Sequence, residues 1–72
     1  MTDDKEAIKK TAKRLKAARK ASQLTQAEVA KRAGISETYY AQVERAQKNP
    51  TTTVFTKIIN AIGVTSAEIL DK

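Results

Sequence analysis

Signals that start and stop helices constrain this chain more than any other feature of its sequence. Thr25–Glu28 and Thr65–Glu68 both read Thr-x-x-Glu, a pattern in which the Thr hydroxyl accepts from a backbone N–H while the Glu carboxylate reaches back. Gly34 and Gly63 each follow a helical segment and can take the positive φ that ends a helix. With a turn at Asn49-Pro50, these signals divide the chain into short helices.

The pattern predicts an all-α, five-helix domain that occupies residues 1–72 as a single unit. The expected helices cover residues 3–21, Thr25 to Gly34, residues 37–45, Thr51 or Thr52 to Gly63, and a last short segment that carries Ile69 and Leu70. The stretch 54–59 hints at a strand, but Thr56 and Lys57 interrupt its apolar run. We therefore predict no strand.

The charge balance favours a polyanionic partner. Fourteen Lys and Arg against eight Asp and Glu give a net charge of +6, and residues 1–20 hold eight of these bases and three of the acids. Such an excess is typical of proteins that bind nucleic acid. A lysine-rich helix face that is merely solvated is the alternative for residues 5–16.

Several classes of function are excluded by the residues that the chain lacks. It has no histidine and no cysteine, which are common zinc ligands and catalytic groups, and no glycine-rich phosphate loop. We therefore expect no enzyme activity, no metal, no cofactor and no small-molecule ligand. Without a signal-peptide pattern or a membrane-spanning run, we also expect no membrane partner and a cytoplasmic protein.

Residues 26–44 show the spacing of a helix-turn-helix, two short helices joined by a tight turn. Val29 is apolar, Ala30 is small where two helices cross closely, and Gly34 lies at the turn. Tyr40 and Val43 fall on positions that point back to the core.

The ordered set of these residues resembles the lambda-repressor and Cro-like (XRE-type) DNA-binding domains of phage and bacterial regulators. The resemblance covers about Leu15 to Leu70 and is carried by Arg19, Leu24–Ala30, Ala33–Ser36, Val43–Arg45, Asn49-Pro50 and Ala61–Val64. It implies a compact five-helix fold, and the start of the third helix is similar to restriction-modification controller proteins. Ala46 stands where the family commonly has Gly, so we expect that helix to run on or to end without a left-handed residue. Thr52 replaces a common Leu.

An α-helix fits the major groove with the side chains near its N-terminus against the base edges. A helix that begins after Ser36 presents the candidate base-reading residues Glu37, Thr38, Tyr39 and Gln42. Gln42 can pair with adenine, Thr38 can bond a base or touch a thymine methyl, and Glu37 can accept from cytosine. The alternatives are a solvated amide for Gln42, a dipole-favoured acid for Glu37 and a structural side chain for Tyr39.

Gln26 begins the second helix, where free backbone N–H groups attract an anion. The resemblance also implies a phosphate contact for Gln26, although ordinary helix-start polarity is the alternative. The resemblance implies further phosphate contacts at Lys48, Asn49 and Thr51, and Thr25 and Ser36 complete the candidate set. The resemblance further implies an internal ion pair between Arg19 and Glu44, which we assign to structure.

These features predict a sequence-specific double-stranded DNA-binding transcription regulator, bacterial or phage-encoded, that acts as a homodimer on a two-fold operator. The alternative is an antitoxin-like subunit that uses the same fold to hold a protein. If Phe55, Ile58 and Ile62 fill the inward stripe of the fourth helix, a surface patch for dimerisation remains, formed by Ile59, Val64, Ile69 and Leu70. The other possibility is that some of these four complete the core.

Overall fold

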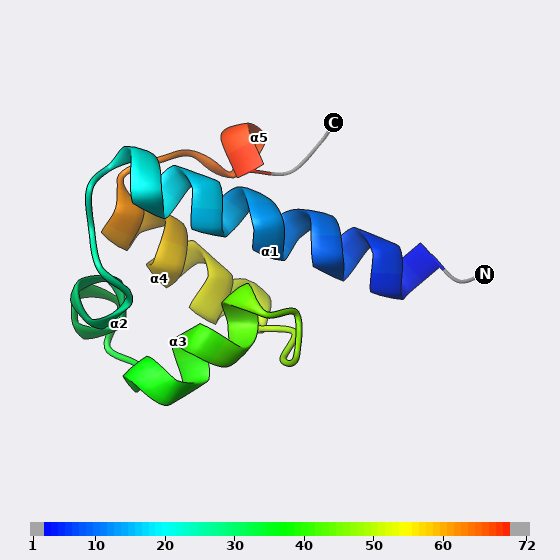
Figure 1. Cartoon of the computed structure of the whole chain (residues 1–72), viewed down its shortest axis with the longest axis horizontal. Helices are drawn as coiled ribbons and strands as arrows, with labels where there is room; N and C mark the ends of the chain where they lie inside the picture. Colours follow the sequence, from blue (N-terminus) through cyan, green and yellow to red (C-terminus); the bar gives the residue numbers. More distant parts are fainter. Residues whose placement is uncertain (1–2, 70–72) are drawn as a thin grey trace.

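Each helix begins and ends close to the signals found in the sequence (Figure 1). The computed structural model describes residues 3–69, in which the helices are α1 (Asp3–Ala21), α2 (Gln26–Ala33), α3 (Glu37–Glu44), α4 (Thr52–Ile62) and α5 (Ser66–Ile69). No strand occurs between residues 3 and 69. The predicted five-helix, all-α fold is therefore confirmed.

The caps of α4 and α5 show why these helices start where they do. The Thr51 hydroxyl accepts from the Val54 backbone N–H at 3.2 Å and caps α4. Before α5, the Thr65 N–H donates to the Glu68 carboxylate at 2.8 Å, and the Thr65 hydroxyl accepts from the Glu68 N–H at 3.3 Å. Gly63, with a φ of +93°, ends α4 in the left-handed conformation.

The end of α3 differs from the expectation. Ala46 adopts the left-handed conformation that the sequence led us to exclude, with a φ of +61°. Its N–H donates to the Val43 carbonyl at 3.0 Å, and the next N–H, of Gln47, donates to the Gln42 carbonyl at 2.8 Å. These two hydrogen bonds satisfy the last carbonyls of α3, and they hold the turn in place although a Cβ makes this φ unfavourable.

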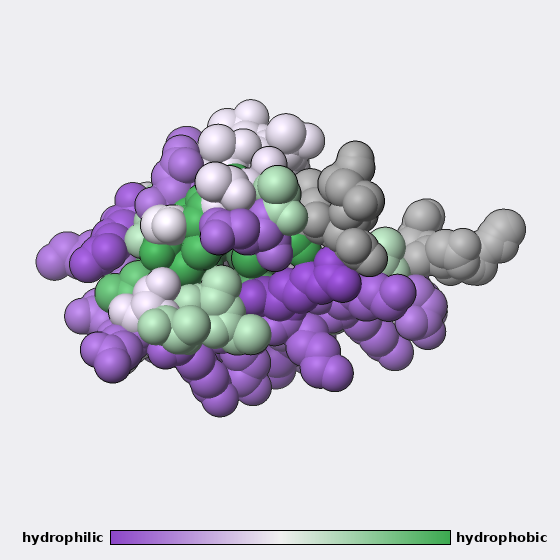
Figure 2. Space-filling model, turned by 90° about the horizontal axis from the view of Figure 1, so that it is seen from above, coloured by the Kyte–Doolittle hydropathy of each residue, from purple (hydrophilic) through white to green (hydrophobic). Residues whose placement is uncertain are grey.

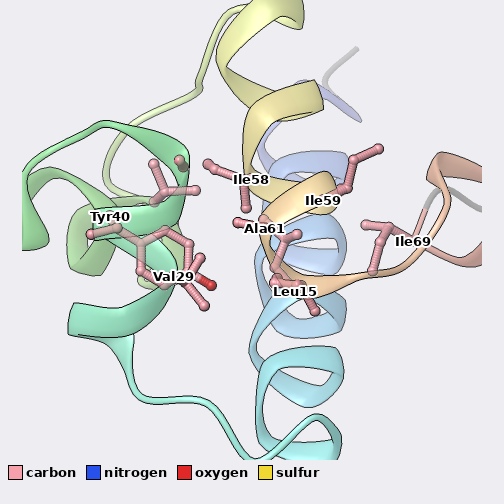
Figure 3. Close-up of a cluster of buried hydrophobic side chains, with 11 residues drawn as sticks. Leu15, Val29, Tyr40, Ile58, Ile59, Ala61 and Ile69 are labelled. Atoms are coloured by element: carbon pink, nitrogen blue, oxygen red, sulfur yellow. The ribbon is translucent and has the colours of Figure 1, made fainter.

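The core lies where α1 to α4 meet (Figure 3). Leu15 of α1, Val29 of α2, Tyr40 of α3 and Ile58 of α4 have no exposed surface. Helix α2 packs against both α3 and α4, while α1 packs against α3, α4 and α5. Because α2 and α3 are both held by these neighbours, their relative position is fixed by the core.

The prediction of a surface patch is wrong for Ile59 and Ile69, which are 6% and 2% exposed and belong to the core. Helix α4 is covered by α2 and also by α1, so its apolar face is wider than one stripe, and α5 folds back onto α1 (Figure 3). Phe55, predicted to point inward, is half-buried and lines a groove beside α1. Val64 is half-buried, and Leu70 lies outside the described residues.

No helix within residues 3–69 combines the length and the apolar character that crossing a membrane would require. The same residues contain no group of three or more acidic residues close enough to hold a metal ion.

Candidate nucleic-acid interface

Two capped helices and the turn between them form the frame of the site. At the start of α2, the Thr25 hydroxyl accepts from the Glu28 N–H at 3.1 Å, and the Thr25 N–H donates to the Glu28 carboxylate at 2.8 Å. The hydrogen bond from the Thr25 backbone lowers the pKa of Glu28 below its usual range. Gly34 ends α2 with a φ of +75°, and the Ser36 hydroxyl accepts from the Tyr39 N–H at 3.0 Å to begin α3.

Helix α3 lies at the edge of the molecule opposite α5 (Figure 1), and the polar residues of its first turn lie outside the core. Glu37 and Thr38 are exposed, and Gln42 is half-buried. Tyr39 is also half-buried and packs against the core. The first turn of α3 therefore exposes Glu37 and Thr38, and Gln42 follows one turn later, an arrangement that suits insertion into a groove.

Three of the candidate phosphate contacts are also helix caps. The hydroxyls of Thr25, Ser36 and Thr51 each accept a backbone N–H with one lone pair. A hydroxyl also carries one hydrogen, which a phosphate oxygen could accept. Capping and a phosphate contact are therefore compatible at these three positions.

The segment between α3 and α4 holds the other candidate contacts. Lys48 and Asn49 are exposed there. Arg45, to which the sequence analysis gave no role, is exposed at the end of α3, where its Nε donates to the Gln47 side-chain oxygen at 3.3 Å. The signal that could have found it is a base directly after the last turn of the groove-facing helix.

Arg19 and Glu44 lie in contact inside the fold, as the resemblance implied. The Arg19 Nε donates to Glu44 Oε2 at 2.6 Å and a terminal nitrogen donates to Oε1 at 3.1 Å, which makes the pair bidentate. A third donation, from Arg19 to the Leu24 carbonyl at 2.9 Å, ties down the segment before α2. Arg19 and Glu44 are 9% and 7% exposed, so this pair joins α1, α3 and the start of α2 in the interior.

The structure also shows a contact that the sequence analysis missed. The Gln26 side-chain Nε2 donates to Glu44 Oε1 at 2.9 Å, across 18 residues. The Tyr40 hydroxyl lies close to the same carboxylate but is buried without a hydrogen bond. No local pattern signals the Gln26 contact, because it depends on how α2 and α3 cross.

The ionisation of this cluster follows from its surroundings. Burial alone raises the pKa of Glu44, but the donors Arg19 and Gln26, the Tyr40 hydroxyl and the positive charge of Arg19 outweigh it, so its pKa is lowered. The hydrogen bond with Glu44 raises the pKa of Arg19. Burial and the nearby Glu44 raise the pKa of Tyr40. At neutral pH the cluster therefore holds an arginine cation, a carboxylate and a neutral phenol.

Basic side chains are concentrated on α1, as the sequence showed. Figure 2 shows hydrophilic side chains gathered along one long edge of the molecule, beside a smaller apolar area. The exposed lysines of α1 are Lys5, Lys9, Lys10, Lys13, Lys16 and Lys20. They contribute most of the positive field that would attract a polyanion over long range.

Known proteins are similar to this chain in both sequence and structure. The profile of the helix-turn-helix family matches residues 15–69. An immunity repressor protein of Bacillus phage phi105 is 35% identical over 57 residues, which cover 79% of this chain and 40% of that protein. An uncharacterized HTH-type transcriptional regulator of Sinorhizobium fredii is 38% identical over 47 residues, which cover 65% of this chain and 61% of that protein. The chain thus spans less than two thirds of either relative.

Among solved structures, the chain is similar to the restriction-modification controller protein C.AhdI of Aeromonas hydrophila. The two share a TM-score of 0.90 and 28% sequence identity, over 96% of this chain and 100% of that chain. All five helices, and not the two of the motif alone, therefore have counterparts in a protein of this kind.

Proposed function

The chain belongs to the helix-turn-helix family, and from this membership we propose that it is a sequence-specific DNA-binding transcription regulator. The observation that carries the proposal is the capped α2–turn–α3 unit, which is fixed from inside by Arg19 and Glu44 and exposes the polar start of α3. The relatives' names, a repressor, a transcriptional regulator and a controller protein, support the same function. That family also agrees with our expectation that the chain is not an enzyme.

In this proposal α3 enters the major groove and reads bases with the residues predicted from the sequence. Gln42 pairs with adenine through its amide, Thr38 contacts a base edge or a thymine methyl, and Glu37 accepts from cytosine N4. Tyr39 packs against the core and offers its hydroxyl at the rim of the contact.

The phosphate backbone is held on both sides of α3. Gln26 and the hydroxyls of Thr25 and Ser36 contact one stretch of backbone, and the segment 48–51 contacts another through Lys48, Asn49 and Thr51. Arg45 adds a cation at the end of α3, next to that second group.

The proposal extends to a homodimer on a two-fold operator, in the cytoplasm of a bacterium. The support is physical: one short recognition helix reads too few base pairs to find a single site in a genome, and two-fold pairing places two such helices about 34 Å apart. Because Ile59 and Ile69 are buried, the interface must use other residues, of which the half-buried Val64 is a candidate. Sedimentation equilibrium at tens of micromolar tests the assembly, and a monomer there would refute it.

Binding-site selection from random duplexes, followed by titration of the recovered duplex at 50 to 200 mM salt, tests the function. We expect binding that weakens steeply with salt, by about 0.9 in log-log slope for each phosphate neutralised. Gln42→Ala should cost roughly 1–3 kcal/mol at one base pair. Asn60→Ala, which removes an exposed amide on α4, is the matched control and should change nothing. Recovery of no common sequence, with a salt slope near zero, would refute DNA binding and favour the antitoxin-like alternative.

A further inference from the structure

We propose that Glu44 is a positioning residue for DNA binding, because its carboxylate fixes the Gln26 amide so that the second N–H of that amide faces a phosphate at the start of α2. The inference rests on the proposed DNA-binding function. Glu44 would then have a role in DNA binding in addition to its internal ion pair with Arg19.

The Glu44 carboxylate acts from inside the fold and does not itself reach DNA. Its side chain is 2% exposed, and both of its oxygens accept from Arg19. Arg19 is in turn anchored on the Leu24 carbonyl, two residues before Gln26. The acceptor that Gln26 meets is therefore held at a defined place relative to the start of α2.

The hydrogen bond to Glu44 orients the side-chain amide of Gln26. The Gln26 Nε2 carries two hydrogens that lie in the amide plane, and one of them is donated to Glu44 Oε1 at 2.9 Å. Because the amide is also tied to the backbone through its side chain, fixing one N–H restricts the orientation of the amide plane and with it the direction of the other N–H. Gln26 is half-buried, which leaves part of the residue open to solvent, where the second N–H would lie.

The open side of this amide lies at an anion-attracting place. Gln26 is the first residue of α2, and the early backbone N–H groups of a helix lack intrahelical partners. The Glu28 N–H is already used by the Thr25 hydroxyl, which leaves the N–H groups of Gln26 and Ala27 beside the amide. A phosphate oxygen there meets the backbone donors and the amide donor together.

Two physical gains follow from this arrangement. A glutamine that is free in solution loses rotamer entropy when it binds a phosphate, whereas Gln26 is already ordered by Glu44 before DNA arrives. The negative charge of Glu44 does not repel the phosphate strongly, because the bidentate Arg19 balances it. Loss of Glu44 should therefore weaken DNA binding through Gln26.

A double-mutant cycle on DNA affinity tests this coupling, with Gln26→Ala, Glu44→Gln and the double variant measured by fluorescence anisotropy on the selected duplex and on a random-sequence duplex. Circular dichroism at the same temperature corrects each value for the folded fraction. Glu6→Gln, on the exposed surface of α1, is the control for the same change in net charge.

We expect Gln26→Ala to weaken binding to both duplexes at least about tenfold, the size of a hydrogen bond to a charged group. Glu44→Gln should weaken binding about threefold or more relative to the Glu6→Gln control. In the Gln26→Ala background the same substitution should change affinity by less than about twofold, although its effect on thermal stability persists.

The outcomes separate the two proposals. An equal loss from Glu44→Gln with and without Gln26 would mean that Glu44 supports only the fold, and would overturn the positioning role. A wild-type protein that binds DNA and a Gln26→Ala variant that binds equally well would also overturn it, while leaving the proposed function intact. Failure of the wild-type protein to bind any duplex would instead overturn the proposed function.

If Glu44→Gln does not fold, Gln26 can be followed directly by NMR in the wild-type protein. The Nε2 hydrogen donated to Glu44 should resonate away from the position of a free glutamine amide, and DNA should shift mainly the other hydrogen of that amide. Gln26→Asn, one methylene too short to reach both groups, should lose about tenfold in affinity. Side-chain signals typical of a free glutamine, or full affinity of Gln26→Asn, would refute the inference.

Discussion

Replacing Arg19 by methionine should reveal how strongly the buried cluster supports the motif. The substitution keeps an unbranched side chain in the interior but removes two hydrogen bonds to Glu44 and one to the Leu24 carbonyl. Glu44 then keeps only the donation from Gln26. The carboxylate of a side chain that is 2% exposed would be left without a counterion.

Breaking a buried ion pair by removing one partner costs about 3–5 kcal/mol. A domain of this length has a free energy of unfolding of about 4–11 kcal/mol, at roughly 0.05–0.15 kcal/mol per residue. The substitution should therefore remove about a quarter or more of the free energy of unfolding. A loss of that size lowers the melting temperature by about 12–40 °C in a domain of 60–100 residues.

Urea titration followed by circular dichroism at pH 7 measures the loss in free energy of unfolding. The comparison variant combines Arg19→Met with Glu44→Leu, which replaces the pair by apolar side chains. Because exchange of a buried pair for hydrophobic residues is often nearly neutral, the double variant should recover at least half of the loss.

The stability loss caused by Arg19→Met should depend on pH, and the pKa of Glu44 determines the direction of that dependence. In the wild-type protein the pKa of Glu44 is lowered from its ordinary 4.5, so its contribution is present above that value and is lost as the pH falls through the lowered pKa. Without Arg19, burial raises the pKa of Glu44 instead, and the penalty is then largest at neutral pH. The stability gap between wild type and Arg19→Met should therefore narrow as the pH falls from 7 towards 4.5.

A loss below about 1 kcal/mol for Arg19→Met would refute the reasoning, because that is the size expected of a solvent-exposed pair. The reasoning would also be refuted if the stability loss of the double variant equalled the sum of the losses from Arg19→Met and Glu44→Leu measured separately. A difference in free energy of unfolding between wild type and Arg19→Met that stays constant from pH 7 to 4.5 would refute it too.

Three further substitutions test other features of the fold. Tyr40→Phe removes a buried hydroxyl that has no hydrogen bond among the described residues but lies close to the Glu44 carboxylate, so urea titration should show a change in the free energy of unfolding of less than about 1 kcal/mol; a larger loss would place a hydrogen bond to Glu44 there. Ala46→Gly relieves a side chain at a φ of +61° and should stabilise by about 0.5–1 kcal/mol in the same assay, whereas destabilisation would contradict the left-handed turn. Ile69→Asp places a charge in the core and should abolish the cooperative thermal transition, while Val64→Asp should leave the protein folded. If the Ile69→Asp variant is folded and monomeric, Ile69 is exposed and the core assignment is wrong.

Features that depend on residues three or four apart could be predicted from the sequence. The capping interactions of Thr25 and Thr65 are present as written in the sequence, and Thr51 caps α4 as one of two expected positions. These contacts form within one turn of a helix, so the local order of residues determines them. The helix-turn-helix itself is a run of such local signals.

Features that depend on how helices cross could not be predicted in this way. Ile59 was assigned to a surface because one stripe of α4 was counted as the inward face, whereas both α2 and α1 pack on this helix, and Ile69 was assigned there although α5 packs on α1. The contact between Gln26 and Glu44 has no sequence pattern at all. The Arg19–Glu44 pair was expected from the family resemblance and not from spacing.

Ala46 shows a third case, in which packing overrides local preference. An alanine alone disfavours a positive φ, yet α3 and the segment leading to α4 require a sharp turn there, and two backbone hydrogen bonds stabilise it. The residue type indicates which φ is preferred, and the surrounding fold determines the φ that Ala46 adopts.

The most direct test of the central claim is to map the DNA contact on the protein by backbone amide chemical shifts during titration with the selected duplex. We expect the largest changes on residues 25–27, 36–42 and 45–51, and small changes in α5. Changes concentrated on α5 or on the lysine-rich side of α1, with residues 36–42 unaffected, would contradict the claim that α3 reads DNA.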